Sequence, residues 1–428
     1  MQSCRISAIV RLRSLPTQCI IEKMSQIKIE VEPSCAPHSG LRPGAAPPRN
    51  SFTRINPERL FTLGSLWLQN NKKPGRRTYK ETRLRWNSLH NIYADYLYFQ
   101  PNELDTDAEG EDLTRLSEIV GVAMGMAAML IEFNVNLNRF SRFTTPGSKK
   151  KRVDFEYYSG SRRYFHETKG TTNPNTASNM RGDIAAKKQQ SLQYVADQQK
   201  AGNVVQQAAI SGSTGSIALY RHVSDTTFET QITLIDPPAE ELANARPAGE
   251  ADELACVLGY YQNFYKVTHP NVRNVRSFYI AEWLWEIIAD LSQGKNAPRR
   301  APRNLRVIPH LAEPDVPDSP YKGAIFDARI AWRSIKKFPT FEEATNAIPR
   351  PVTFLGVSQR VTDLIRACDW TGLLEFHDPG QFTDEIDGVD ISDSGIMSRR
   401  IDPQTVNPDS EKAFLSMKRF LKMTGNRM

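Results

Sequence analysis

The sequence predicts a mixed α/β domain over residues 111–237, in which a β-sheet is flanked by helices. Two patterns indicate this class. Apolar residues recur at helical spacing over 113–130, and short segments of alternating apolar and polar residues follow. The predicted order is helix, three strands, helix and two strands, which ends at Pro237–Pro238 and is typical of a layered α/β domain.

The first helix is expected to begin near Asp112 or Thr114, because either side chain can accept hydrogen bonds from free amides of the first turn. The next segment, 131–143, reads IEFNVNLNRFSRF and alternates apolar with polar residues, so it predicts the first strand. The longest apolar run of the chain, 119–131, is shorter than the roughly 20 residues of a membrane span. We therefore expect a buried core helix in a soluble protein that has no membrane contact.

Segments 152–158 (RVDFEYY) and 162–170 (RRYFHETKG) predict a β-hairpin, which supplies the second and third strands. Either Ser159–Gly160 or Gly160–Ser161 can form its turn, since glycine accepts the positive φ that tight hairpin turns require. The two turns give different pairings of the strands.

Three charged residues of the hairpin fall on one face. With a Ser159–Gly160 turn, Glu167 is the diagonal neighbour of Asp154, and with a Gly160–Ser161 turn it lies directly opposite. Lys169 joins them in both cases because side chains alternate with period two. Such neighbours lie roughly 5–8 Å apart, so the two acids can share one divalent cation. The other interpretation is a solvated hairpin in which Lys169 forms an ordinary salt bridge.

Two more side chains of the hairpin are assigned by the same alternation. Glu156 shares the face of Asp154 and is a spare ligand, whereas His166 falls on the opposite face. After the hairpin, the polar segment 173–183 predicts a loop. A helix over 184–202 ends near its glycine, and the last two strands are predicted at 215–223 and 230–236.

The rest of the chain divides by composition. Residues 1–55 are rich in proline, glycine and small residues and predict a mostly disordered extension, of which 1–23 are either a targeting segment or an extension upstream of a start at Met24. Residues 56–110 predict a basic helical segment. Residues 238–428 predict a mostly helical region of unknown role that would contact a second copy of the chain or a partner protein. Its helices are expected at 250–267, 276–294, 340–348, 359–374 and 409–424.

The formal net charge of +7 suits a polyanionic partner but does not by itself require one. One basic stretch, 72–86, contains Arg76 and Arg77, and a second consists of Lys149, Lys150, Lys151 and Arg152. We expect both stretches to contact phosphates of a nucleic acid. The five scattered cysteines include no CxxC pair, so they predict neither a zinc site nor a disulfide framework and favour a reducing, cytoplasmic compartment.

The hairpin and its context resemble the PD-(D/E)XK nuclease superfamily, whose restriction-endonuclease-like fold has an αβββαβ core. Asp154 matches the first acid of that motif, with Val153 in place of its proline. Glu167 and Lys169 match the E-x-K element on the next strand. Glu118, in LSEIVG of the first helix, is similar to the helical acid that many members carry.

The helix after the hairpin adds a resemblance to the RecB-like branch of this superfamily. Gln190 and Tyr194, in QQSLQY, fit its Q-x-x-x-Y element, and residues four apart share one helix face. In that branch the pair helps to position the nucleic-acid strand or the metal ligands. The resemblance covers residues 111–237 and rests on the motif and its context.

The resemblance implies a Mg²⁺-dependent deoxyribonuclease that also accepts Mn²⁺ and has DNA as its partner. Asp154, Glu167, Glu118 and the carbonyl of Thr168 would hold the ion. Lys169 would orient the attacking water or neutralise the phosphoryl oxygens. A role in defence, restriction or DNA processing would follow. Two other classes stay open: a non-catalytic nucleic-acid-binding protein on the same fold, and a structural or scaffold protein.

Overall fold

The computed structural model describes most of the predicted α/β domain and parts of the remaining chain. The described residues are 25–31, 50–55, 97–100, 103–133, 135–143, 153–159, 162–200, 210–225, 229–235, 249–268, 276–303, 305, 321–325, 352–378, 389–391 and 394–401, with single positions between 60 and 96.

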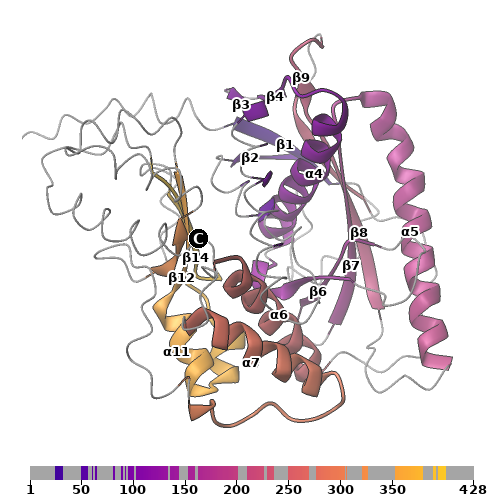
Figure 1. Cartoon of the computed structure of the whole chain (residues 1–428). Coiled ribbons are helices and arrows are strands. Elements are labelled where there is room, and N and C mark those ends of the chain that lie inside the picture. Colours follow the sequence, from indigo (N-terminus) through magenta and orange to yellow (C-terminus); the bar gives the residue numbers. More distant parts are fainter. Residues whose placement is uncertain are drawn as a thin grey trace, which may run out of the picture.

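A seven-stranded sheet forms the centre of the molecule, in the strand order β2-β1-β10-β8-β7-β6-β5 (Figure 1). The pairs β1–β10 and β7–β8 are parallel and the other pairs are antiparallel, so the sheet is mixed. Its strands are β1 (Ser25–Val31), β2 (Asn50–Ile55), β5 (Phe140–Arg142), β6 (Phe155–Ser159), β7 (Arg162–Thr171), β8 (Ile210–Leu219) and β10 (Gln231–Ile235). The predicted mixed α/β class is confirmed.

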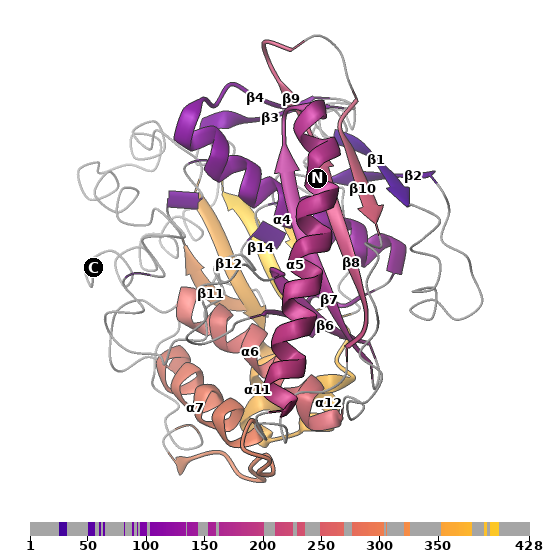
Figure 2. The same cartoon turned by 90° about the vertical axis from the view of Figure 1, so that its right-hand side faces the viewer.

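Helices α4 (Gly110–Phe133) and α5 (Pro174–Lys200) lie on opposite sides of β7 and β8 (Figure 1). Adjacent residues of β8 follow this division: Ala218 belongs to the core that contains α4, whereas Ile217 packs with Ile184 of α5. Figure 2 shows α5 running along the outer face of β7 and β8. The order α4, β5, β6, β7, α5, β8 follows the order that the sequence predicts.

The backbone of α4 packs directly against the backbone of β7. A Cβ atom on Gly121 would lie 2.6 Å from the Gly170 nitrogen, and one on Gly170 would lie 2.0 Å from the Ser117 carbonyl oxygen. No larger residue fits at either position, so the two glycines set the distance between helix and strand. Among the described residues, α4 is the one helix long and apolar enough to cross a membrane. However, 78% of its apolar window is buried inside the protein, as in the core helix that the sequence predicts.

The strand predicted over 131–143 is wrong for its first half. Helix α4 continues to Phe133, a 3₁₀ turn follows at Leu137–Arg139, and only β5 is extended. Ile131 and Phe133 prolong the apolar surface of the helix, and Phe133 is buried in the core. Asn136 then caps the 3₁₀ turn by accepting a hydrogen bond from the amide two residues later. The alternating apolar and polar residues of 131–137 therefore belong to the end of α4 and the turn after it, and not to a strand.

The loop predicted over 173–183 is also wrong, because α5 begins at Pro174. Proline fits the first helical position, where its missing N–H is not needed. The Asn173 side-chain oxygen accepts hydrogen bonds from the amides of Asn175 and Thr176, at 2.9 and 3.3 Å. The Asn-Pro pair is thus a helix start, and most of the polar residues after it are exposed.

Two strands lie within residues 1–55, where the sequence analysis predicts a mostly disordered extension. β1 pairs with β10, and β2 covers the outer edge of β1. Ile27, Ile29 and Val31 are buried and alternate with polar residues, which is a strand pattern. The surrounding proline-rich sequence obscures this short strand pattern. The proposed targeting segment 1–23 lies outside the described residues.

A three-stranded sheet, in the order β3-β4-β9, covers one end of the α/β layer (Figure 1). Its first two strands occupy the last part of 56–110, so the prediction of a helical segment is wrong there. The Arg221 guanidinium donates to both carboxylate oxygens of Asp105, at 2.9 and 2.8 Å, and so ties β9 to β4. The strands are β3 (Leu97–Gln100), β4 (Glu103–Thr106) and β9 (Arg221–His222).

The C-terminal region contains a four-stranded antiparallel sheet, in the order β11-β12-β14-β13, as well as helices. Our prediction of a mostly helical region misses this sheet, in which β11, β12 and β14 pair although they are far apart in the sequence. The elements are α6 (Glu250–Thr268), α7 (Arg276–Leu291), β11 (Tyr321–Ile325), β12 (Val352–Ser358), α11 (Gln359–Ala367), α12 (Trp370–Leu374), β13 (Val389–Ile391) and β14 (Ile396–Ile401). The helices predicted at 340–348 and 409–424 lie outside the described residues.

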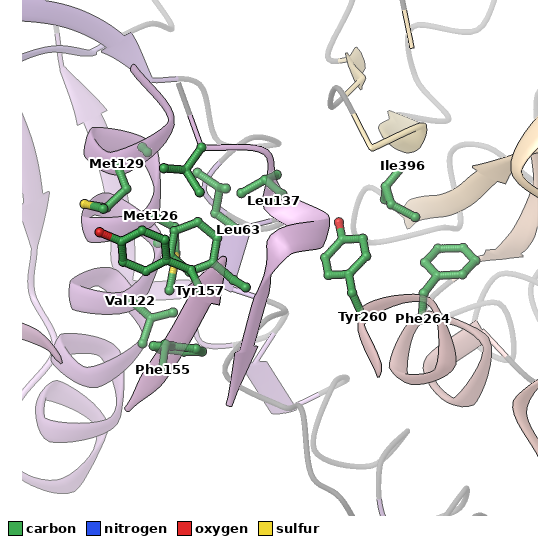
Figure 3. Packing of buried hydrophobic residues seen from close by; sticks show 14 of the residues in the cluster. Leu63, Val122, Met126, Met129, Leu137, Phe155, Tyr157, Tyr260, Phe264 and Ile396 are labelled. Atoms are coloured by element: carbon green, nitrogen blue, oxygen red, sulfur yellow. The ribbon is translucent and has the colours of Figure 1, made fainter. Parts of the chain in front are cut away.

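The C-terminal region shares one core with the α/β layer. Tyr260 and Phe264 of α6 and Ile396 of β14 belong to the same buried cluster as Val122 and Met126 of α4 (Figure 3). The aromatic residues of α6 therefore pack inside the protein.

Candidate active site

The hairpin of β6 and β7 has the register in which Asp154 lies opposite Glu167. Phe155 pairs with His166, and the pairs along β6 follow one another without a bulge. Asp154, one residue before Phe155, therefore lies opposite Glu167, one residue after His166. This register is the one predicted for a turn at 160–161, two residues that lie outside the described part of the chain.

Glu167 faces α5, whereas its neighbour His166 faces α4. Phe165, two residues before Glu167, packs in one cluster with Leu192 of α5. On the other side of the sheet, His166 Nδ1 lies 2.8 Å from Thr214 Oγ1. Burial lowers the pKa of His166 to about 3, so the ring is neutral at physiological pH. The expectation that His166 lies away from the acids is confirmed.

Glu167 is fully buried, and both of its carboxylate oxygens have partners. Oε2 accepts a hydrogen bond from the Asp154 amide at 3.0 Å. Oε1 lies 2.5 Å from Lys187 Nζ and 3.1 Å from Lys169 Nζ. The backbone of one acid thus fixes the side chain of the other, and two ammonium groups meet at a single oxygen.

Asp154 precedes β6 and its carboxylate is held by Thr168. Asp154 Oδ2 accepts hydrogen bonds from the Thr168 amide at 3.2 Å and from the Thr168 hydroxyl at 3.0 Å. The other oxygen, Oδ1, lies 3.7 Å from Lys187 Nζ. The nuclease resemblance implies that the Thr168 carbonyl is a metal ligand. The groups of Thr168 that bond Asp154 are its amide and hydroxyl.

Lys187 is the residue that sequence reasoning missed. It lies on α5, and its ammonium group reaches both carboxylates from the helix side. Its position is fixed by Ser191, whose hydroxyl accepts the Val153 amide at 3.0 Å and donates to the Lys187 carbonyl at 2.8 Å. Ser191 and Val195 are buried, so the helical spacing of these residues with Lys187 was the signal that could have found it.

Within the cluster, burial and the neighbouring charges shift the pKa values of Glu167 and Lys187. Burial, together with the Asp154 carboxylate, raises the pKa of Glu167 to about 7, although Lys187 and Lys169 oppose this. Burial lowers the pKa of Lys187, but the carboxylates of Asp154 and Glu167 outweigh burial and raise it. Lys187 is therefore a permanent cation at neutral pH, while the buried carboxyl of Glu167 loses its proton near neutrality.

The structure does not bring Glu118 and Gln190 to this cluster. Both side chains are exposed, and within the described residues no hydrogen bond or ion pair joins either of them to Asp154 or Glu167. Tyr194 is half-buried on α5, with its ring centroid 6.3 Å from that of Phe143.

Other predicted residues are engaged elsewhere or lie outside the described part. The spare ligand Glu156 accepts a hydrogen bond from Arg163 Nε at 2.7 Å and one from Ser141 Oγ at 3.1 Å. The six basic residues assigned to phosphate contacts lie outside the described residues. They are Arg76, Arg77, Lys149, Lys150, Lys151 and Arg152.

The donor set fits a single hard cation. Asp154 and Glu167 turn one oxygen each, Oδ1 and Oε1, toward the point where the Lys187 ammonium lies. Carboxylate oxygens are the ligands that Mg²⁺ prefers, and one or two of them with water suffice. In the described part of the chain, no group of three or more histidine, cysteine or acidic side chains forms a larger cation site.

The cluster is open to solvent on one side. The side chains of Asp154 and Lys169 are each 20% exposed and that of Lys187 is 17% exposed, while that of Glu167 is 0% exposed. An anion that approaches from water therefore meets two ammonium groups and the Asp154 carboxylate before it reaches the buried Glu167.

No protein-family model, curated protein or solved structure matches this chain.

Proposed function

We propose that this chain is a metal-dependent nuclease that hydrolyses phosphodiester bonds in DNA. The observation that carries the proposal is the convergence of Asp154, Glu167 and Lys169 at one solvent-facing point between β7 and α5. A solvated surface hairpin would not bury Glu167 completely or hold Asp154 with two hydrogen bonds. Buried carboxylates are costly, and clusters of them with perturbed pKa values are typical of functional sites.

The order of elements supports a restriction-endonuclease-like core. In α4, β5, β6, β7, α5 and β8 the chain has the αβββαβ order of that fold, and the acids come from its second and third strands or just before them. The proposal rests on two carboxylates, Asp154 and Glu167, and does not require Glu118.

Each residue has a distinct role in the proposed reaction. Asp154 and Glu167 would hold Mg²⁺ or Mn²⁺, which would supply a water of lowered pKa and stabilise negative charge in the transition state. Thr168 orients Asp154, whose amide in turn orients Glu167. The Lys169 ammonium, 3.1 Å from Glu167 Oε1 and partly exposed, is placed to neutralise a phosphoryl oxygen bound next to the carboxylates. Arginine in its place would bind phosphate but would not match the geometry of an ammonium group.

Plasmid cleavage by the full chain tests the proposal. Supercoiled DNA should be cut with MgCl₂ or MnCl₂ and stay intact with EDTA. Glu167→Ala and Lys169→Ala should each slow cleavage by about 100-fold or more, because each removes a charge used in the transition state. Asp197→Asn, on the exposed side of α5, is the control and should cut at the wild-type rate. Cleavage by both site variants at the wild-type rate would remove the assignment.

A second candidate is DNA binding without catalysis. One observation favours it: the ammonium groups of Lys169 and Lys187 balance the two carboxylates. In that case the full chain would bind duplex DNA with an affinity that falls steeply with salt, and neither Mg²⁺ nor Mn²⁺ would produce cleavage.

A further inference from the structure

We propose that Lys187 is a built-in counter-ion of the carboxylate pair, and that a divalent cation must displace it to bind. This inference rests on the proposed function, because it concerns the same two acids. It adds a residue from α5 that regulates when the pair is free to hold a metal.

Lys187 Nζ lies 2.5 Å from Glu167 Oε1 and 3.7 Å from Asp154 Oδ1, so its ammonium group pairs with one oxygen of each acid. Mg²⁺ binds oxygen at about 2.0–2.1 Å. An ion bound by both of these oxygens would occupy the space that the ammonium group takes, and the two cations cannot be there together.

When both acids are deprotonated, the two negative charges of Asp154 and Glu167 balance the two positive charges of Lys169 and Lys187 within one cluster. A divalent ion added to this neutral set would leave an excess positive charge beside a fully buried carboxylate. Withdrawal of one ammonium reduces that excess, and repulsion between close cations is strong where water is excluded.

The side chain of Lys187, and not the helix that carries it, is the group that moves. Ser191 anchors α5 through the Val153 amide and the Lys187 carbonyl, so the helix backbone stays in place. The Lys187 side chain is 17% exposed and ends a flexible four-carbon stem, so rotation carries Nζ outward. Lys169 has its described ion pair with Glu167 alone.

Displacement gives Lys187 two successive tasks. Without metal, its ammonium neutralises the acids and stabilises the folded site. With metal, the released ammonium lies at the solvent-facing rim beside Lys169, where a phosphate group would meet both. Metal binding and phosphate binding would therefore each increase the affinity for the other, because the Lys187 ammonium that leaves the carboxylates becomes free to contact the phosphate.

Titration of the full chain with MnCl₂, in the absence of DNA, tests the proposal by calorimetry. Lys187→Met should bind Mn²⁺ about tenfold more tightly than the wild type, because the competing cation is gone. Lys187→Gln should shift affinity in the same direction and guards against misfolding of the first variant. Lys295→Met removes the same charge from an exposed ion pair with Asp290 and should leave Mn²⁺ affinity unchanged. Glu167→Gln should abolish the measurable binding.

A thermal unfolding series gives a second readout. Without metal, Lys187→Met should melt below the wild type, and saturating MnCl₂ should raise its Tm by more than it raises that of the wild type. Equal or weaker Mn²⁺ affinity in both Lys187 variants would overturn the counter-ion role, as would the absence of Mn²⁺ binding in every variant. If the wild type cleaves DNA but the Lys187 variants bind Mn²⁺ no more tightly than the wild type does, the nuclease proposal is retained and the counter-ion role is rejected. Tighter Mn²⁺ binding without any cleavage would leave only the counter-ion role.

Discussion

At the scale of single residues, Glu167 decides how the site responds to pH. Its pKa in the folded chain is about 7, above the usual value of 4.5, because burial and the Asp154 carboxylate disfavour its charge. A raised pKa means that the folded state holds this proton more tightly than the unfolded state does. The stability that the protonated carboxyl contributes is complete below pH 4.5 and is lost as the pH rises through 7.

Glu167→Gln should therefore remove one part of the pH dependence of stability. In urea unfolding with EDTA, the wild type should lose about 2 kcal/mol between pH 5 and pH 7 relative to the variant. The comparison with the variant matters, because His166 is present in both chains and its low pKa makes both more stable as the pH rises to 6.5. A constant difference between the two chains from pH 5 to pH 7 would contradict the assigned cause.

Thr168 supports Asp154 through one hydroxyl group, and this contact can be removed alone. Thr168→Val keeps the shape of the side chain and the amide, but it deletes the hydroxyl that donates to Asp154 Oδ2. We expect a loss of about 1–2 kcal/mol in the free energy of unfolding, since the bond has a charged acceptor. Thr168→Ser retains the donor and should retain most of the stability in the same urea titration. Equal losses in both variants would assign the effect to packing.

At the scale of elements, the contact of α4 with β7 places the strand that carries Glu167. Gly170→Ala would put a Cβ atom 2.0 Å from the Ser117 carbonyl, so the helix must move off the sheet. We expect a loss of about 3 kcal/mol or more in the free energy of unfolding, measured with urea. Gly182→Ala in α5 is the matched control, because a Cβ atom there meets nothing within 4 Å. In a helix it should stabilise by about 0.5–1 kcal/mol, and a similar result at Gly170 would refute the close contact.

The elements also show which patterns predict structure. β6 and β7 could be predicted because apolar and polar residues alternate on both sides of a short turn. This period of two residues places Asp154 and Glu167 on one face of the hairpin. Lys187 was not predicted, because α5 carries two adjacent lysines and many polar residues, so its inward face is weakly marked. β1 and the start of α5 had local signals, namely buried alternation and the Asn173 cap, that composition obscured.

At the scale of the whole molecule, pairing between distant segments was the part that the sequence could not provide. β1 pairs with β10 and β12 with β14, and nothing in either partner's local pattern identifies the other. The boundary expected after 237 had a chemical basis in Pro237–Pro238. The core nevertheless continues across it, because α6 packs its aromatic residues into the cluster that contains α4.

This shared core predicts that the α/β layer depends on the C-terminal region for its stability. The Asn138 side chain donates to the Tyr261 hydroxyl at 3.4 Å, and that hydroxyl donates to the Ser394 carbonyl at 2.8 Å. One residue of α6 therefore joins the 3₁₀ turn before β5 to the turn before β14. A chain that ends at Pro238 would expose the apolar surface that α6 covers, at a cost of about 25 cal/mol for each Å². We expect it to lose its near-ultraviolet circular dichroism and its cooperative urea transition. A chain that ends at Ile401 retains every described contact and should unfold cooperatively. Cooperative unfolding of the shorter chain would establish instead that the layer with the candidate site folds alone.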